Sequence, residues 1–396
     1  MGLRCEDDGD IPGCFGELIR AAAEKYGQRA VVLVDEYDKP ILDNLHRPEV
    51  ATQMRAGLRN FYSVIKDSDA FLQFAFLTGV SKFSPVSIFF GLNNLTDITL
   101  SAAYATICGY TEADLDAVFA PELEGLEREE IRRWYNGYQW LGASVYNPFD
   151  LLLLFRERQF RNYWFETGTP TFLVNWLKER GFYTPQLQRC LADEALLASF
   201  DVEAIEPEAL LWQTGYLTIR KLTQIGALRS YELGVPNLEV QTALNRALLA
   251  GWHPAAGRAM SAGLSILHAL AQGDTAALRA HFERLYASIP HDWYRNNAIA
   301  QYEGYYASVF YSHLAALGLD LIAEDVSQYG QCDLTVRHAG MTYLFEFKLI
   351  DGDEATGAAL AQLKSRNYAA KYPPPKIEIG IEFSRTRRQI VGWQVG

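Results

Sequence analysis

The chain has 396 residues, of which 49% are hydrophobic and 21% are charged, and its net charge is −12. This length allows two or three domains with separate cores. The acidic balance argues against broad, sequence-independent adhesion to nucleic acid, while it leaves room for a local basic site. No stretch resembles a signal peptide or the roughly 18 apolar residues of a membrane span, so we expect a cytoplasmic protein that does not enter the membrane.

The five cysteines are scattered, odd in number and never in CxxC spacing: Cys5, Cys14, Cys108, Cys190 and Cys332. Such spacing indicates neither a disulfide framework nor a zinc cluster. It favours a reducing compartment.

The N-terminal part predicts an α/β domain over residues 1–103. Apolar residues at helical spacing predict a helix over Phe15–Tyr26, and the run Ala30–Val34 predicts a parallel-type strand buried on both faces. Phe71–Leu77 forms a second apolar run that predicts a neighbouring strand, and Ser87–Phe90 is a candidate start of another short element. We expect a partial P-loop NTPase-like parallel sheet.

The middle region, residues 104–290, is predicted to be mostly helical. Asn147 can cap a helix that begins at the following proline. A second helical stretch covers Gly263–Ser288 and is broken near its centre by a Gly-Asp pair. Leu217–Lys221 and Ser230–Leu233 are candidate strands within this region.

Residues 291–396 predict a C-terminal α/β domain in the order helix, strands, helix, strand. The first helix begins at Glu303 and runs to about Leu317, and the second covers about Thr356–Tyr372. Three prolines then end that helix and lead into a strand over Ile377–Phe383.

The most informative stretch is "YGQCDLTVRHAGMTYLFEFKLI", residues 329–350. Asp333 stands at the start of one alternating strand, and Glu346 and Lys348 stand on the returning strand. Because side chains alternate along a strand, Glu346 and Lys348 share one face. A carboxylate and an ammonium group are therefore expected to face one cleft.

This arrangement suits metal-assisted phosphodiester hydrolysis. Asp333 and Glu346 can bind one or two Mg²⁺ or Mn²⁺ ions through oxygen ligands, and Lys348 can orient the attacking water or neutralise the transition state. Glu303 continues the apolar stripe of its helix and is expected to point toward the sheet. Gln362 lies on the helix that follows the carboxylate strand.

A basic segment accompanies these residues. Residues 361–396 contain seven Lys or Arg and two Glu, a local charge of +5 in an acidic protein. A basic segment beside carboxylates is what a nucleic-acid backbone would meet.

A purely structural role for these residues stays open, because the pattern Glu-x-Lys on a strand is common. Asp333 could cap a turn, and Lys348 could pair with Glu346. The combination with Glu303 and Gln362 in this order of elements is more specific and favours a nuclease-type site.

These residues resemble the PD-(D/E)XK nuclease superfamily, whose pattern is Asp, a variable gap, then Glu-x-Lys. The whole chain resembles bacterial AAA-ATPase-like proteins that carry a C-terminal domain of that superfamily, through "LVDEYDKPIL", "FLTGVSKFS", "WYNGYQW", "VYNPFDLL", "YWFETGTPTFLV", "WQTGYLTI", "LGVPNLEV" and "FEFKL". The resemblance implies a restriction-endonuclease-like fold with nucleic acid as partner, DNA favoured over RNA, and leaves homo-oligomerisation open. It implies catalytic roles for Asp333, Glu346 and Lys348, for the helical acid Glu303 and for Gln362.

Asp35 and Glu36 follow the first strand and match a Walker B motif, and Thr78 follows the second strand as a candidate γ-phosphate sensor. A P-loop also needs a glycine-rich cradle with a Lys, yet the sequence contains no Gly-Lys dipeptide. We therefore expect a degenerate or truncated ATPase-like module without autonomous ATP hydrolysis.

Three functions stay open at this point. The first is a Mg²⁺-dependent nuclease attached to the degenerate module. The second is a non-catalytic module that binds nucleic acid or protein. The third is an ATP-dependent switch whose P-loop is supplied by a longer form or another chain.

Overall fold

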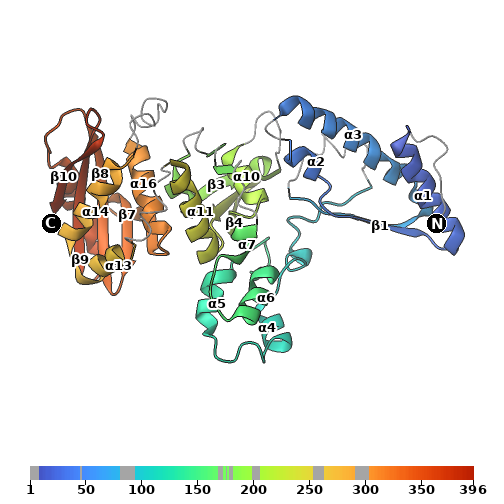
Figure 1. The fold of residues 1–396 in the computed structure, drawn as a ribbon, viewed down its shortest axis with the longest axis horizontal. Coiled ribbons are helices and arrows are strands. Elements are labelled where there is room, and N and C mark those ends of the chain that lie inside the picture. The colour runs from blue at the N-terminus through green and yellow to red at the C-terminus, as the bar shows by residue number, and fades with distance from the viewer. Residues whose placement is uncertain are drawn as a thin grey trace. The chain divides into compact units, whose positions relative to one another are not determined.

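The computed structural model describes residues 9–44, 47–80, 94–167, 173–174, 176–177, 182–198, 206–252, 263–289 and 303–396. The chain is α/β, as predicted, with helices and strands in both halves of the sequence (Figure 1). It divides into two compact units. Unit 1 comprises Met1–Ile107, Trp140–Ala143 and Leu191–Glu232, and unit 2 comprises Cys108–Gln139, Ser144–Cys190 and Leu233–Gly396. The predicted boundaries after residues 103 and 290 stay predictions.

Unit 1 contains two parallel strands with helices packed beside them. Its elements are α1 (Ile11–Tyr26), β1 (Ala30–Val34), α2 (Lys39–Leu42), α3 (Pro48–Asp67), η1 (Asp69–Phe71), β2 (Leu72–Leu77), η2 (Ala102–Tyr104), α9 (Glu194–Ala198), α10 (Pro207–Gln213) and β4 (Thr218–Ile225). Strands β1 and β2 pair in parallel, and α1 packs on α3 through stacked Phe15 and Phe61 rings 4.6 Å apart. The predicted helix and both predicted strands are confirmed.

The prediction that β1 is buried on both faces is wrong. Val31 is 56% exposed and Leu33 is 70% exposed, while Ala30, Val32 and Val34 are half-buried. An apolar run is compatible with helices packed on both faces of a strand, but it does not show whether a helix covers each face. The element predicted at residues 87–90 lies outside the described residues.

The helical part of unit 2 surrounds a small apolar core. Its elements are α4 (Glu112–Val118), α5 (Arg128–Tyr135), α6 (Pro148–Glu157), α7 (Tyr163–Thr167), η3 (Thr184–Gln188) and α11 (Leu238–Trp252). Asn147 caps α6 as predicted, because its Oδ1 accepts a hydrogen bond of 2.9 Å from the Phe149 N–H. Tyr135, Tyr146 and Leu151 are fully buried in the core between these helices.

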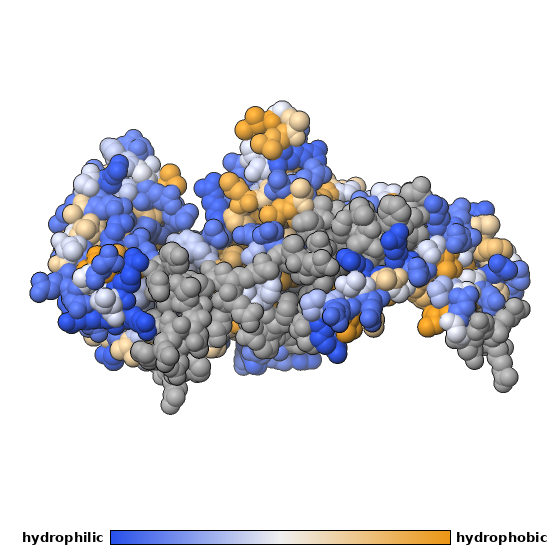
Figure 2. Space-filling model, turned by 90° about the horizontal axis from the view of Figure 1, so that it is seen from above, coloured by the Kyte–Doolittle hydropathy of each residue, from blue (hydrophilic) through white to orange (hydrophobic). Residues whose placement is uncertain are grey.

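A three-stranded sheet has the order β3–β5–β4, with β3 at Cys190–Asp193 and β5 at Leu228–Gly234. Strands β4 and β5 confirm the two strands predicted in the middle region, whereas β3 was not predicted. The turn between β4 and β5 leaves Ile225 74% exposed and Leu228 66% exposed. Figure 2 shows one face of the molecule, where apolar patches stand out among mostly polar residues.

The C-terminal part of unit 2 is a five-stranded mixed sheet covered by helices (Figure 1). Its elements are α13 (Gly263–Gln272), α14 (Thr275–Ala287), α16 (Glu303–Ala315), β6 (Asp320–Ser327), β7 (Gly330–His338), β8 (Met341–Ile350), α17 (Ala358–Arg366), η6 (Tyr368–Lys371), β9 (Lys376–Ser384) and β10 (Gln389–Val395). The strand order is β10–β9–β8–β7–β6, and only β8 and β9 pair in parallel. Helix α17 connects these two strands, as a parallel pair requires.

Both faces of β8 are buried because helices lie on both sides of the sheet. Phe310 of α16 packs on Phe345 and Phe347, with ring centroids 5.0 and 5.1 Å apart. On the opposite face, Leu344 packs against Leu363 of α17. The predicted alternation along this strand is therefore confirmed, and the predicted helix and strand order is present.

Two further findings concern membrane-spanning helices and the cysteines. No helix among the described residues has the length and apolar character needed to cross a membrane. Cys14 is disulfide-bonded, which the cysteine spacing did not indicate, whereas Cys108, Cys190 and Cys332 are free. Spacing alone does not reveal which thiols meet in space.

Candidate active site

The structure brings together the five residues that the sequence singled out in the C-terminal part of the chain. Asp333 lies on β7, Glu346 and Lys348 lie on β8, Glu303 begins α16 and Gln362 lies on α17. The β7–β8 register places Leu334 opposite Phe345, so Asp333 and Glu346 are neighbours across the two strands. Their catalytic roles stay predictions, but their convergence is a property of the fold.

Lys348 stands between two carboxylates. Its Nζ lies 3.8 Å from Glu303 Oε1 and 3.9 Å from Glu346 Oε1. The Lys348 side chain is 31% exposed, so it can reach a bound substrate while its charge is balanced from both sides. Glu303 is fixed in turn by the Leu349 N–H, which donates a hydrogen bond of 3.0 Å to Oε2.

Glu346 is a buried carboxylate with an incomplete set of partners. It is 1% exposed, and Gln362 Nε2 donates to its Oε1. No described residue offers a hydrogen bond to its Oε2. Burial raises the pKa of Glu346 to about 8, and the neighbouring charge of Asp333 adds to this, while Lys348 opposes it. An unneutralised carboxylate here is costly, and a cation would relieve that cost.

Asp333 shows the same electrostatic pattern in a milder form. Burial raises the pKa of its carboxyl group to about 6, with an added contribution from Glu303. The Phe347 N–H limits this rise by donating a hydrogen bond of 2.7 Å to Asp333 Oδ2. The bond also fixes the Asp333 side chain beside β8.

The residues fit a divalent cation that keeps most of its water. The unpartnered Oε2 of Glu346 and the adjacent Asp333 carboxylate are hard oxygen donors of the kind that Mg²⁺ binds. In the described parts of the chain, no three His, Cys, Asp or Glu side chains are arranged as a ready-made metal cage. Proteins typically bind Mg²⁺ next to a phosphate through one or two carboxylate ligands, with water molecules as the remaining ligands.

Helix α17 is held in place by a carboxylate that the sequence analysis did not identify. Glu382 on β9 accepts a hydrogen bond of 2.9 Å from Thr356 Oγ1 and one of 3.3 Å from the Ala359 N–H. These bonds fix the start of the helix one turn before Gln362. Hydrogen bonds from Thr356 help to lower the pKa of Glu382, although burial opposes them. Glu382 therefore positions the residue that contacts Glu346.

Three of the seven basic residues of the basic segment pair with acids within the protein. Arg385 pairs with Asp351 and Arg387 pairs with Asp353, each at 3.0 Å. Lys371 pairs with the buried Asp325. The net positive charge that the sequence shows in this segment is thus reduced by acids from other parts of the fold.

The residues predicted for nucleotide binding lie together in unit 1. Thr78 Oγ1 donates a hydrogen bond of 2.5 Å to Asp35 Oδ1, at the carboxyl ends of β1 and β2. Glu36 has a left-handed backbone, with φ of 54°. Sequence reasoning missed Asp38, which is fully buried and accepts a hydrogen bond of 3.1 Å from the Val80 N–H. Asp38 follows the strand by four residues, and nothing in the sequence at that position indicates that its side chain would be buried.

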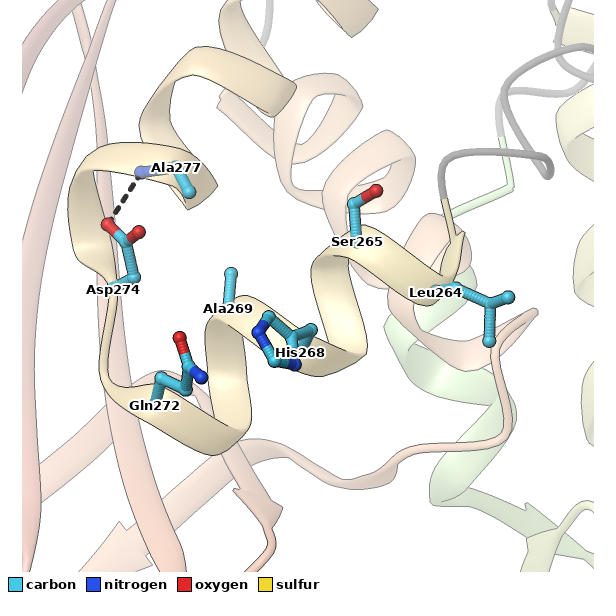
Figure 3. Close-up of a pocket in the computed structure, with 7 residues that line it drawn as sticks. All are labelled: Leu264, Ser265, His268, Ala269, Gln272, Asp274 and Ala277. Atoms are coloured by element: carbon cyan, nitrogen blue, oxygen red, sulfur yellow. Dashed lines mark hydrogen bonds between the residues drawn. The ribbon is translucent and has the colours of Figure 1, made fainter.

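A separate hollow of about 440 Å³ lies along α13 and the start of α14 (Figure 3). It is lined by Leu264, Ser265, His268, Ala269, Gln272, Asp274 and Ala277. Asp274 is engaged as a helix cap, because its Oδ1 accepts a hydrogen bond of 2.9 Å from the Ala277 N–H. The loop after α13 meets the Met341 end of β8, five residues or roughly 17 Å from Glu346. The hollow is thus distinct from the carboxylate cluster.

The fold and the cluster together define a class of protein: a mixed α/β unit of restriction-endonuclease-like organisation, with two carboxylates and a lysine on adjacent central strands. The comparisons agree with this class. Residues 301–393 match the model of the PD-(D/E)XK nuclease superfamily, and residues 3–89 match the model described as "Predicted AAA-ATPase".

A curated relative extends the likeness to nearly the whole chain. The "Uncharacterized protein in vnfD 5'region" of Azotobacter chroococcum mcd 1 is 58% identical over 384 residues, which is 96% of this chain and 74% of that protein. No solved structure matches the chain. The chain therefore belongs to the bacterial AAA-ATPase-like proteins that carry a C-terminal PD-(D/E)XK nuclease superfamily domain.

Proposed function

We propose that the protein is a nuclease that hydrolyses phosphodiester bonds of nucleic acid, preferably DNA, with Mg²⁺ or Mn²⁺ in the cytoplasm. The observation that supports this most is the unpartnered Oε2 of the buried Glu346, next to Asp333. The other oxygen of the same carboxylate, Oε1, lies 3.9 Å from Lys348 Nζ. A buried carboxylate that keeps a free acceptor is costly unless it binds something positive.

Each residue of the cluster has a separate role in the proposed reaction. Asp333 and Glu346 would hold the metal ion, which when bound stabilises charge on the phosphate oxygens and activates water. Lys348 is placed to stabilise the negative charge that develops on the phosphate. Gln362 orients Glu346, and Glu303 balances the charge of Lys348.

The direct test is cleavage by the purified full chain. We expect labelled double-stranded DNA to be cut in Mg²⁺ or Mn²⁺ and to remain intact in EDTA, with activity restored when excess Mg²⁺ is added. Binding without cleavage in either metal, unaffected by EDTA and weakened by salt, would instead support the non-catalytic binding module. The same assay with single-stranded DNA and RNA determines the substrate class.

A second candidate is an ATP-dependent switch. It is favoured by the hydrogen bond between Thr78 and Asp35 at the strand ends, in the region that matches a predicted AAA-ATPase. This function needs a phosphate cradle from a longer form or another chain, because the sequence holds no Gly-Lys dipeptide. Calorimetry with ATP and Mg²⁺ tests whether this chain binds nucleotide without another chain. A heat of binding that is lost in Asp35→Asn would support the switch. The absence of any heat of binding would leave Asp35 and Glu36 without that role.

A further inference from the structure

A short segment far upstream of the matched nuclease region is fixed to it. We call residues 182–188 the tyrosine segment; it consists of Phe182, Tyr183 and η3. Thr184 is fully buried, and its Oγ1 donates a hydrogen bond of 3.1 Å to the Ser308 carbonyl of α16. Ser312 Oγ on the same helix donates a bond of 2.9 Å to Thr184 Oγ1. The segment thus has a defined position along α16.

The far end of the tyrosine segment is bonded to the edge strand β6. Gln188 Nε2 donates a hydrogen bond of 2.7 Å to the Leu321 carbonyl, and Gln188 Oε1 accepts one of 2.9 Å from the Ala323 N–H. One amide side chain therefore satisfies the outer edge of β6 in the way a neighbouring strand would. The segment belongs structurally to the nuclease sheet, although residues 301–393 alone match the nuclease model.

Immediately after this bond, β6 is irregular at one residue. Glu324 has a left-handed backbone with φ of 49°, while Ala323 and Asp325 on either side keep their pairs with Leu334 and Cys332. The register therefore places Glu324 directly across from Asp333. A left-handed Glu in a strand is uncommon, and such strain often occurs at functional sites.

Tyr183 lies beside the first turn of α16, the helix that begins with Glu303. Its ring approaches the start of α16, where a Cβ built on Gly304 would lie 3.5 Å from Tyr183 Cδ2. Burial raises the pKa of its hydroxyl, and the negative charges of Asp333, Glu324 and Glu303 raise it further. The Tyr183 ring therefore lies next to the residue that follows Glu303, and its hydroxyl stays protonated.

We infer that Tyr183 is a substrate-binding residue of this site, whose hydroxyl donates a hydrogen bond to a phosphate oxygen of the nucleic acid held at Asp333 and Glu346. This inference rests on the proposed nuclease function and deepens it. It assigns to the site a residue from the middle of the chain, more than a hundred positions before the nuclease elements.

The chemistry of the surroundings explains why a phenol suits this place. An Arg or Lys would pair with Asp333, Glu324 or Glu303 and would compete with a metal ion for the same oxygens. A neutral hydroxyl leaves the carboxylates available and still offers a donor to an anionic phosphate. The bonds of Thr184 and Gln188 hold the tyrosine segment at both ends, so the donor is fixed before the substrate arrives.

The test compares Tyr183→Phe with wild type in the full chain, using labelled double-stranded DNA and Mg²⁺. Because the change removes only the hydroxyl, we expect KM to rise about tenfold to a hundredfold, the range for a hydrogen bond to a charged group, with little change in kcat. Tyr104→Phe, a half-exposed tyrosine of unit 1, is the matched control and should leave KM unchanged. Thermal midpoints of both variants should equal that of wild type.

The outcomes separate this inference from the proposed function. An active wild type with the same KM in Tyr183→Phe overturns the role of Tyr183 and leaves the nuclease standing. A loss of activity accompanied by a lower thermal midpoint also overturns the binding role, since it indicates a structural one. A wild type that neither binds nor cleaves DNA with Mg²⁺ or Mn²⁺ overturns the nuclease and the inference together.

Discussion

Replacing Glu346 with glutamine is expected to lower metal-dependent cleavage by about a hundredfold to a thousandfold, the usual loss when one group that stabilises the transition state is removed. The amide keeps the size of the side chain but lacks the charge that would bind a divalent ion. Lys348→Met should lose activity to a similar extent, because it removes a cation 3.9 Å from the same carboxylate. Initial rates of DNA cleavage at saturating Mg²⁺ measure both changes.

The free energy of unfolding of Glu346→Gln shows whether its loss of cleavage comes from the missing carboxylate or from misfolding. Glu346 is 1% exposed and lacks a partner at Oε2, so burying this carboxylate, or protonating it to avoid a buried charge, costs the folded state free energy when no metal is present. Glu346→Gln should therefore raise the free energy of unfolding by about 1 to 3 kcal/mol in EDTA. Mg²⁺ should stabilise wild type and should not stabilise the variant.

A carboxylate of the same sheet serves as the control for Glu346. Glu378 lies on β9 opposite Leu344 and has no part in the cluster, so Glu378→Gln should leave cleavage and the Mg²⁺ effect unchanged. Full activity in Glu346→Gln would contradict the proposed site. Equal loss in Glu378→Gln would show that the assay reports folding of the sheet.

The sequence was sufficient for most of the nuclease elements because their signals are local. Strand alternation places Glu346 and Lys348 on one face, and the helical stripe that follows Glu303 predicts α16. Gln362 could be named from the family resemblance, and it contacts Glu346 in the structure. Each of these residues lies within an element whose period is visible in a short window.

Contacts between distant segments carry no such signal. Gln188 bonds to Ala323 across 135 positions, and Thr184 bonds to Ser308 across 124. Nothing in the composition around Tyr183 indicates that it would approach Gly304, next to Glu303. In the same way, the apolar run of β1 could not show that Leu33 would be 70% exposed. The burial of a strand face and the pairing of distant segments depend on tertiary packing, which leaves no local pattern in the sequence.

One such long-range pair makes the helical layer behind the nuclease sheet sensitive to acid. His281 of α14 and His313 of α16 are buried, and their Nε2 atoms lie 2.9 Å apart. One ring must donate and the other accept, so at least one ring is neutral, and burial favours the neutral form of both. Burial lowers the pKa of His281 to about 4, with help from the charge of Arg284, and burial and His281 lower the pKa of His313 to about 3.

The sign of the effect follows from the direction of these shifts. An unfolded histidine takes up a proton near pH 6.5, whereas the folded pair resists it, so the unfolded state binds more protons below that pH. The stability contributed by the pair is present above about pH 6.5 and is lost as the pH falls toward 4. With both rings contributing, the free energy of unfolding of unit 2 should fall by about 2 kcal/mol per pH unit in this window.

The double variant His281→Leu/His313→Leu isolates this contribution from that of the carboxylates. It keeps apolar volume between α14 and α16 and removes both titrating groups, so its free energy of unfolding should depend less steeply on pH between 6.5 and 4. Denaturant unfolding at pH 7.5, 6.0 and 5.0 measures both slopes. Equal slopes in wild type and variant would mean that both rings take up protons in the folded state as readily as in the unfolded one, which a contact of 2.9 Å between two buried Nε2 atoms does not allow, because one of them must accept.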